Sequence, residues 1–396
     1  MAKKPAVSRE QQIVTWSELN QLRALDVLPE AFEKATIDTG SGTPVYDING
    51  DVLFHRIPLT RGRSAAGYVD MAASPVLGEP LVATSIGAVW DPDALVKQAT
   101  RAAHALGITG VDRAMARFVA FSFPKVAVQL LAGGEELVML ELFSWEPVPP
   151  SRRTIRYEPP SNFERWSFID EIPDDERALR VDRFKARVKR WREALRQVPR
   201  DLELIDSRQF LERFRLLDRY LLGRTRELHY STRGGDHTAC YELRGQQTNV
   251  WCVAASVQML LDFYRYEYSQ VRLAAELGLG TLANPNGLPY SRDSDVVTVI
   301  EDMSRDALNA TMNTSPTFAQ FESEIDQNRP LVSFIPGHSR TVAGYTRSFI
   351  SIAGQAPFRG LLVYDPWPPN AGVITRWENF NTSTYRRTFT AALRKA

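Results

Sequence analysis

Stretches of alternating hydrophobic and polar residues, separated by a turn sequence, predict a β-hairpin in the first part of the chain. Val45–Ile48 and Val52–Ile57 flank Asn49–Gly50, and Asn-Gly tolerates the positive φ angles that a tight type I′ turn requires. The same pattern recurs around a Gly-Gly pair, in the segments Val126–Leu131, Gly133–Gly134 and Leu137–Phe143. The sequence therefore predicts a second hairpin there.

A helix is predicted between the two hairpins. Asp91-Pro92-Asp93 marks its start, because Asp is a favoured N-cap and Pro fits the first helical position. Hairpins around one helix predict a small mixed α+β domain over residues 30–150, after a polar leader at residues 1–29. The domain has no Gly-rich phosphate loop after a strand, and its isolated histidines, His55 and His104, favour structural roles.

A strongly charged stretch follows within residues 151–235. Arg177–Arg200 holds ten Lys or Arg residues against two acids, and its apolar residues recur every third or fourth position. These apolar residues are Val181, Phe184, Val188, Trp191, Leu195 and Val198. The spacing predicts a helix with one face to bury. Its basic face fits a nucleic acid or a solvated surface, and the lack of interleaved aromatic residues favours a solvated helical linker.

The composition of the chain limits the partners and the cellular compartment that we expect for it. The 48 basic and 47 acidic residues nearly cancel, so bulk charge does not favour a nucleic acid or a membrane surface as partner. Two cysteines cannot form a disulfide framework and suit a reducing compartment. The N-terminal segment lacks the apolar core of a Sec signal peptide, and no apolar run is long enough to span a membrane. We expect a soluble cytoplasmic protein, although a non-Sec export route would leave no such signal.

Candidate chemistry concentrates in the third region, residues 236–396. Here Gln246–Tyr264 combines a polar turn with a helix that is apolar around most of its circumference, which predicts a helix at the centre of a domain. Cys252 lies at the first turn of that helix, where free N–H groups and the helix dipole favour the nucleophilic thiolate. Gln246, six residues earlier, could direct its amide at an oxyanion formed on a carbonyl that Cys252 attacks.

A thiolate also needs a basic partner and a group that orients this base. His338 follows the apolar strand Leu331–Ile335 and a Pro-Gly turn, a position from which an imidazole can face a cleft on a fixed backbone. Asp365 ends a second apolar strand, Leu361–Tyr364, and is the natural residue to hold the histidine tautomer. Cys240 precedes the helix by too many residues to share its N-terminus, so we predict a structural role for it.

The order of glutamine, helix-initial cysteine, histidine between strands and strand-end aspartate resembles the papain-like cysteine peptidases. The likeness is closer to compact bacterial members, including bacteriocin-processing-type peptidases and secreted effector proteases, in which Gln-Gln-Thr-x-x-Trp-Cys, Gly-His and Tyr-Asp-Pro-Trp segments recur. It covers about residues 240–385. Two positions depart from the pattern. Val253 stands where a tryptophan is expected, which alters the wall of the cleft, and Asp365 stands where papain has asparagine.

This resemblance implies an α+β chain with a C-terminal papain-like cysteine proteinase fold, in which a central helix packs on an antiparallel sheet. An N-terminal mixed α+β domain and a helical linker would precede it. The implied activity is hydrolysis of a peptide or protein substrate: Cys252 attacks the carbonyl, His338 carries the proton, and Asp365 orients His338. Gln246 and the Cys252 N–H would stabilise the oxyanion. No metal or organic cofactor is implied.

Alternatives stay open at this point. The same residues could catalyse another acyl transfer, such as transglutamination or deamidation, or the fold could serve as a non-catalytic binding module. For residues 1–235 we expect an intramolecular contact that restrains the peptidase region. The segment Arg63–Ala73 faintly resembles the propeptide of streptopain-type peptidases, and a substrate-binding or targeting role is the other interpretation.

Overall fold

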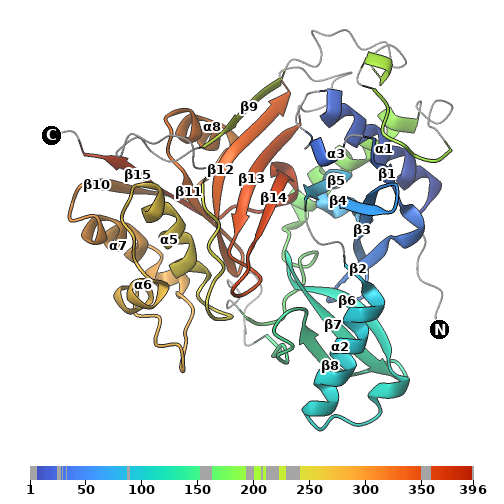
Figure 1. Cartoon of the computed structure of the whole chain (residues 1–396), viewed down its shortest axis with the longest axis horizontal. Coiled ribbons are helices and arrows are strands. Elements are labelled where there is room, and N and C mark those ends of the chain that lie inside the picture. The colour runs from blue at the N-terminus through green and yellow to red at the C-terminus, as the bar shows by residue number, and fades with distance from the viewer. Residues whose placement is uncertain are drawn as a thin grey trace. The chain divides into compact units, whose positions relative to one another are not determined.

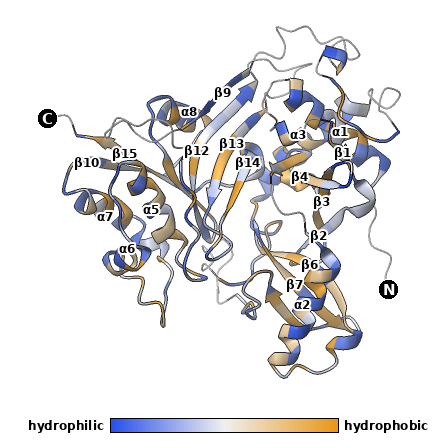
Figure 2. Ribbon diagram, in the orientation of Figure 1, coloured by the Kyte–Doolittle hydropathy of each residue, from blue (hydrophilic) through white to orange (hydrophobic). Residues whose placement is uncertain are grey.

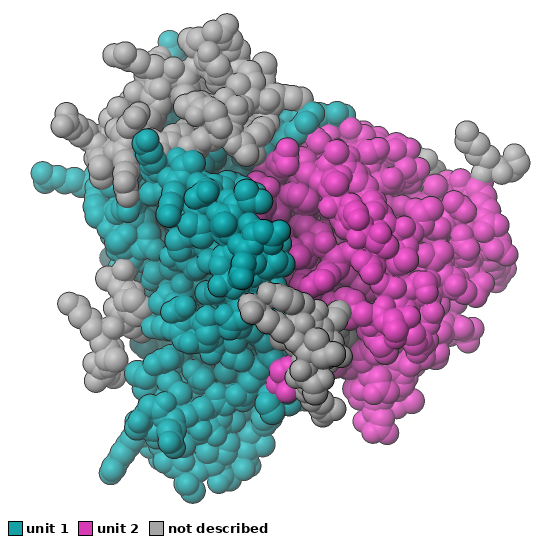
Figure 3. Space-filling view, turned by 180° about the vertical axis from the view of Figure 1, so that it is seen from behind, with its two compact units in different colours: residues 1–150, 164–224, 347–358 teal, residues 151–163, 225–346, 359–396 magenta. Residues whose placement is uncertain are grey.

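Figure 1 shows the computed structural model of the chain, and Figure 3 colours the two compact units into which it divides. Unit 1 comprises residues 1–150, 164–224 and 347–358, and unit 2 comprises residues 151–163, 225–346 and 359–396. The structure describes residues 7–24, 28, 30–32, 34–86, 90–151, 163–192, 200–206, 208–210, 223–228, 241–348 and 358–394.

Unit 1 is built on a sheet with the strand order β5-β4-β3-β2-β6-β7-β8, and β1 pairs with β3. Its strands are β1 (Thr36–Ile37), β2 (Thr43–Asp47), β3 (Val52–Arg61), β4 (Ser64–Ala72), β5 (Leu81–Ser85), β6 (Met115–Ser122), β7 (Lys125–Ala132) and β8 (Glu135–Glu141). The β2–β6 pair is parallel. The antiparallel pairs β2–β3 and β7–β8 are the two hairpins predicted from the turn sequences, and both are confirmed.

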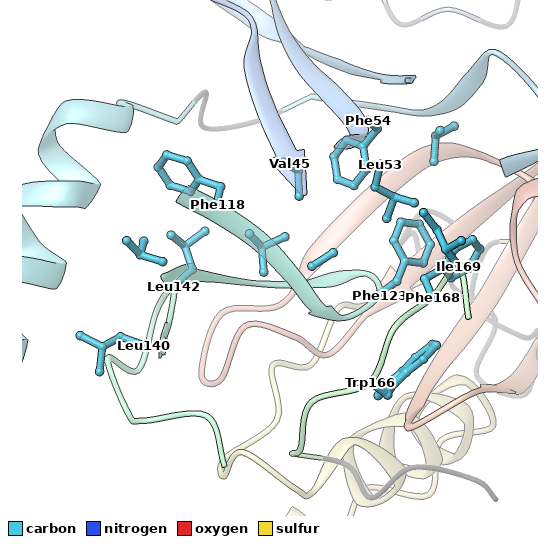
Figure 4. Packing of buried hydrophobic residues seen from close by; sticks show 14 of the residues in the cluster. Val45, Leu53, Phe54, Phe118, Phe123, Leu140, Leu142, Trp166, Phe168 and Ile169 are labelled. Atoms are coloured by element: carbon cyan, nitrogen blue, oxygen red, sulfur yellow. The ribbon is translucent and has the colours of Figure 1, made fainter. Parts of the chain in front are cut away.

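The helix predicted in this region is α2 (Pro92–Ala105), and Asp91 caps it by accepting a hydrogen bond from the Ala94 N–H at 3.0 Å. Its apolar side contributes to the hydrophobic core of unit 1, and Figure 2 shows both hydrophobic and hydrophilic colours on this helix. Figure 4 shows part of that core, with aliphatic and aromatic side chains packed together. The Phe123 ring lies 6.2 Å from Phe54 and 5.0 Å from Phe168, measured between ring centroids.

Two further helices belong to unit 1, and one of them is the helix predicted in the charged stretch. The residues predicted as a polar leader contain the helix α1 (Arg9–Ala24), and those predicted as a linker contain α3 (Asp174–Arg192), which belongs to the same unit. A buried ion pair joins the two helices, because Arg187 binds the Glu18 carboxylate at 2.5 and 2.9 Å. The indole N–H of Trp191 donates to that carboxylate at 2.6 Å. Charge matching thus buries helices whose composition is polar.

The apolar face predicted for the charged stretch is partly covered by the described residues. Trp191 is buried, and Val181, Phe184 and Val188 are half-buried. Leu195 and Val198 lie outside the described residues. Of the basic residues in this stretch, Arg180 and Arg187 are buried, whereas Lys185 and Lys189 are exposed.

In unit 2 the strand order is β10-β15-β11-β12-β13-β14, and β9 pairs with β12. Its strands are β9 (Gly223–Glu227, which begins in unit 1), β10 (Leu308–Asn313), β11 (Leu331–Ile335), β12 (His338–Ser348), β13 (Arg359–Asp365), β14 (Val373–Asn379) and β15 (Arg387–Leu393). The pairs β10–β15, β15–β11, β11–β12 and β13–β14 are antiparallel. Figure 2 shows hydrophobic colour along β13.

The helices described in unit 2 are α5 (Cys252–Phe263), α6 (Gln270–Glu276), α7 (Asp295–Met303) and α8 (Phe318–Asp326). All residues of α5 except Gln258 are buried, and α5 contacts β11. This is the central helix packed on an antiparallel sheet that the resemblance implied, and the α+β class is confirmed. Among the described helices, none is both long and apolar enough to cross a membrane.

Candidate active site

Cys252 is the first residue of α5, as the sequence predicted, and its side chain is buried. The preceding residue, Trp251, is the N-cap and contributes no side-chain cap. Its indole is instead fixed in the core by a hydrogen bond from Nε1 to the Leu279 carbonyl at 3.0 Å. The first N–H groups of a helix point along its axis out of the N-terminal end and have no partners inside the helix, so this position stabilises negative charge on sulfur.

His338 is the first residue of β12 and follows the turn Pro336–Gly337, in which Gly337 has a φ of 66°. A glycine tolerates this left-handed conformation without the steric cost that a side chain would add. The His338 Nε2 atom lies 2.6 Å from Oδ1 of Asp365, the last residue of β13. Both side chains are buried. The structure therefore brings together the histidine and the aspartate that the sequence predicted, and Nδ1 is the ring nitrogen on the other side from Asp365.

Asp365 stays ionised next to this imidazole. Burial by itself raises the pKa of the carboxyl, but the charge of His338 and its hydrogen bond, then the Arg340 charge and the Trp367 N–H, together lower that pKa below its ordinary value. The Trp367 N–H donates to the same Oδ1 at 2.8 Å. An anionic Asp365 accepts a hydrogen bond from Nε2–H, which fixes the tautomer and stabilises an imidazolium.

A buried ion pair lies next in this network, and the sequence reasoning missed it. Arg340 is two residues beyond His338 on β12, and it binds Glu378 of β14 through both terminal nitrogens, with an Nη2–Oε1 distance of 2.7 Å. The hydroxyls of Ser383 and Tyr385 donate to the same Glu378 oxygen at 2.9 and 2.6 Å. The sequence contained one signal for this pair. Side chains alternate along a strand, so Arg340 lies on the same face of β12 as His338.

Gln246 is fully buried, and its backbone is tied to the loop that follows Asp365. Its N–H donates to the Pro366 carbonyl at 2.9 Å, and its own carbonyl accepts from the Asn370 N–H at 2.7 Å. The side-chain Nε2 donates to the Thr248 carbonyl at 2.6 Å. The preceding glycine, Gly245, allows this close approach, since a Cβ there would lie 2.4 Å from the Ala371 nitrogen.

A small pocket reaches this site. It is lined by Val253, Leu288, Tyr290, Phe334, His338 and Ser339. Val253 follows Cys252 directly, so the residue that departs from the family pattern forms part of the pocket wall, as the sequence suggested. Apart from His338 and the hydroxyls of Tyr290 and Ser339, the lining is apolar.

Among the described residues, no cysteine or histidine other than Cys252 and His338 contributes to this site. Cys240 and His237 lie outside them. His104 in unit 1 bonds Asp112 at 2.9 Å on an exposed surface, and His55 is buried in β3. The part of the chain that the structure describes contains no group of His, Cys, Asp and Glu side chains arranged to hold a metal ion.

Residues 240–392 match the Peptidase_C39 like family, which supports a papain-like cysteine peptidase in this part of the chain and confirms the resemblance seen in the sequence. Among solved structures, one similar protein is a double glycine motif protease from an AMS/PCAT transporter, solved in complex with the leader peptide. It is 12% identical, with 39% of this chain and 94% of that chain covered and a TM-score of 0.24.

A second similar structure is UfSP from C. elegans, which is 10% identical with a TM-score of 0.26. The similarity covers 44% of this chain and 35% of UfSP, so the chain spans about a third of the length of that protein. No curated protein matches the sequence.

Proposed function

We propose that the chain hydrolyses peptide bonds through Cys252, His338 and Asp365, with Gln246 as an oxyanion donor. The observation that carries this proposal is the buried His338–Asp365 hydrogen bond of 2.6 Å in the same unit as a helix that begins at Cys252. A histidine held by an ionised carboxylate is the base that a cysteine nucleophile requires. The family match over residues 240–392 supports the same reaction class.

In the proposed reaction, the Cys252 thiolate attacks the carbonyl carbon of the scissile bond. The oxyanion that forms is stabilised by the N–H of Cys252 and by the Gln246 amide. The carbon–nitrogen bond then breaks, and the His338 imidazolium gives its proton to the leaving amine. Water next loses a proton to His338 and attacks the thioester, and the carbon–sulfur bond breaks to release the carboxylate and the thiolate.

Asp365 has the orienting role in this scheme. It accepts the Nε2–H of His338, so that Nδ1 is the nitrogen that exchanges protons with Cys252 and with the substrate. Because Asp365 is ionised, it stabilises the positive imidazolium more strongly than a neutral amide would. Gln246 is placed by main-chain hydrogen bonds to the loop that Asp365 begins, which couples the positions of the two groups.

The test is incubation of the purified full chain with a peptide library of broad sequence content, followed by mass spectrometry of new termini. We expect cleavage by the wild type and by Cys240→Ala, and none by Cys252→Ala. Added primary amine separates the rival acyl transfers, because a transglutaminase would give amine-linked products and a deamidase a mass change without cleavage. A wild type that modifies no peptide while a thiol-directed acylating probe also leaves Cys252 unlabelled would contradict an enzymatic role and favour a binding module.

We also propose that residues 1–235 restrain the peptidase region. The support is that these residues supply none of the four proposed catalytic groups, although they make up more than half of the chain. A shortened chain beginning near Gly235 should then cleave faster than the full chain. A shortened chain that folds and is equally active would contradict restraint and favour substrate binding by the N-terminal residues.

A further inference from the structure

Tyr290 is half-buried in the short 3-10 helix η8 (Tyr290–Arg292), and it lines the pocket beside His338. Its hydroxyl reaches the turn between β11 and β12. It accepts a hydrogen bond from the Gly337 N–H at 2.8 Å and donates one to the Ile335 carbonyl at 3.1 Å. One hydroxyl therefore bridges two backbone groups on the turn that leads directly into His338.

This bridge acts at a position where the backbone needs support. Ile335 pairs with His338 across the hairpin, and Gly337 between them has the left-handed φ of 66°. The N–H of the second residue in a tight turn does not join the strand ladder, so it needs another acceptor. The Tyr290 hydroxyl is such an acceptor, and it fixes the Pro336–Gly337 peptide, one peptide before the bond that joins Gly337 to His338.

The segment that carries Tyr290 is held in place by the side chains of Arg292 and Asp293. Arg292 donates to the Leu277 carbonyl at 3.0 Å and to Asp295 at 2.8 Å. Asp293 accepts from the Arg387 side chain of β15 at 2.8 Å. A hydroxyl on a segment held in this way can resist movement of the turn.

The charge state of Tyr290 suits this contact. Burial is the main cause that raises the pKa of Tyr290 to about 12. The hydrogen bond from Gly337 and the charges of Arg386 and Arg387 act in the opposite direction, and the nearby Cys252 charge acts with burial. The hydroxyl therefore keeps its proton at neutral pH and can donate to the Ile335 carbonyl while accepting from Gly337. The influence of Cys252 also places Tyr290 within electrostatic reach of the proposed nucleophile.

We propose that Tyr290 is a positioning residue of this site, which holds the β11–β12 turn so that His338 faces Cys252 and forms the ion pair with its thiolate. The inference rests on the proposed function, since it assigns Tyr290 to the same reaction. Tyr290 makes and breaks no bond in that reaction. Loss of its hydroxyl should loosen the thiolate–imidazolium pair and leave the pocket wall intact.

The test compares Tyr290→Phe with Tyr268→Phe. Tyr268 is also half-buried, and its hydroxyl donates to the Met303 carbonyl at 2.8 Å, so the control loses a similar hydrogen bond away from the pocket. The Cys252 thiol is titrated by following the ultraviolet absorbance of its thiolate. The spectrum of the same protein carrying Cys252→Ala is subtracted at each pH. This titration needs no reagent to reach a buried sulfur. Cleavage of a peptide identified with the wild type gives kcat and KM.

We expect Tyr290→Phe to raise the midpoint of the Cys252 titration by about one pH unit and to lower kcat at neutral pH about tenfold. KM should stay near that of the wild type, because the ring remains. Tyr268→Phe should match the wild type in all three values. Equal behaviour of the two phenylalanine variants, in a wild type that cleaves, overturns the positioning role. A wild type whose Cys252 titrates as an ordinary thiol and which cleaves nothing overturns the proposed function instead.

A measurement on the unsubstituted chain keeps the inference testable if Tyr290→Phe fails to fold. Hydrogen exchange at the Gly337 amide should be slowed at least about tenfold relative to an exposed loop amide, because opening must precede exchange. Exchange at the rate of an exposed loop amide would overturn the bridge, whatever the variants do.

Discussion

Replacing Arg340 with methionine should destabilise the chain strongly, because Glu378 would remain buried without its cation. The side chains of Arg340 and Glu378 are 1% and 6% exposed. Removing one partner of a buried ion pair typically costs about 3–5 kcal/mol. Glu378 would keep the hydroxyls of Ser383 and Tyr385 as donors at 2.9 and 2.6 Å, so we expect a loss toward the lower end, about 3 kcal/mol.

Urea denaturation of four proteins measures this cost: the wild type, Arg340→Met, Glu378→Leu and the double variant. The double variant should be more stable than the sum of the single losses predicts, because neither charge is then left unpaired. A loss below about 1 kcal/mol for Arg340→Met, the value typical of an exposed pair, would refute the reasoning. Strict additivity of the two single losses would refute it as well.

The same substitution should change the pH dependence of hydrolysis. The Arg340 charge is one of the causes that lower the pKa of Asp365, so Arg340→Met should raise that pKa and move the acid limb of the rate profile to higher pH. Tyr385→Phe leaves both charges in place and serves as the matched control. If the acid limb of Arg340→Met stays at the wild-type pH, the Arg340 charge does not act on Asp365 and the prediction is wrong.

The remaining predictions concern the proposed catalytic groups and their supports. Cys252→Ala should abolish hydrolysis and leave the circular dichroism spectrum unchanged. Asp365→Asn should retain more activity than Asp365→Ala, since an amide oxygen can still accept from His338 Nε2–H; equal kcat values for the two would contradict an orienting role. Asp365 has a lowered pKa, so its contribution to stability is complete above an unfolded pKa of about 3.9 and disappears as the pH falls through the lower folded value, which acid titration of unfolding checks. Gly245→Ala should cost about 1–3 kcal/mol and slow hydrolysis, because its Cβ would meet the Ala371 nitrogen at 2.4 Å; thermal unfolding and kcat test this.

The elements that were predicted correctly have signals that lie within a few residues of one another. The turn at Asn49–Gly50, the cap at Asp91 and the buried helix that begins at Cys252 are all local patterns. The pairing of His338 with Asp365 is a contact between two strands, and it could be predicted because both residues stand at strand ends and because the sequence resembles a known family.

The features that were missed depend on partners distant in sequence. The helix containing Glu18 looks polar until Arg187 and Trp191 approach its carboxylate. Arg340 and Tyr290 became meaningful only when the sheet placed Glu378 and the β11–β12 turn beside them. A sequence shows that a buried charge or hydroxyl needs a partner, but the fold decides which residue supplies it.

The position of β15 among the strands of unit 2 has a consequence for the order in which this chain can mature during synthesis. β15 follows the other described strands in sequence, yet it lies between β10 and β11. Until β15 leaves the ribosome, the edge of β11 has no neighbour on that side, and the hairpin that presents His338 is supported from one direction only. A nascent chain stopped before Arg387 would therefore expose two open strand edges, which are sites for chaperone binding or aggregation. The proposed peptidase would become competent only after β15 (Arg387–Leu393) had been translated.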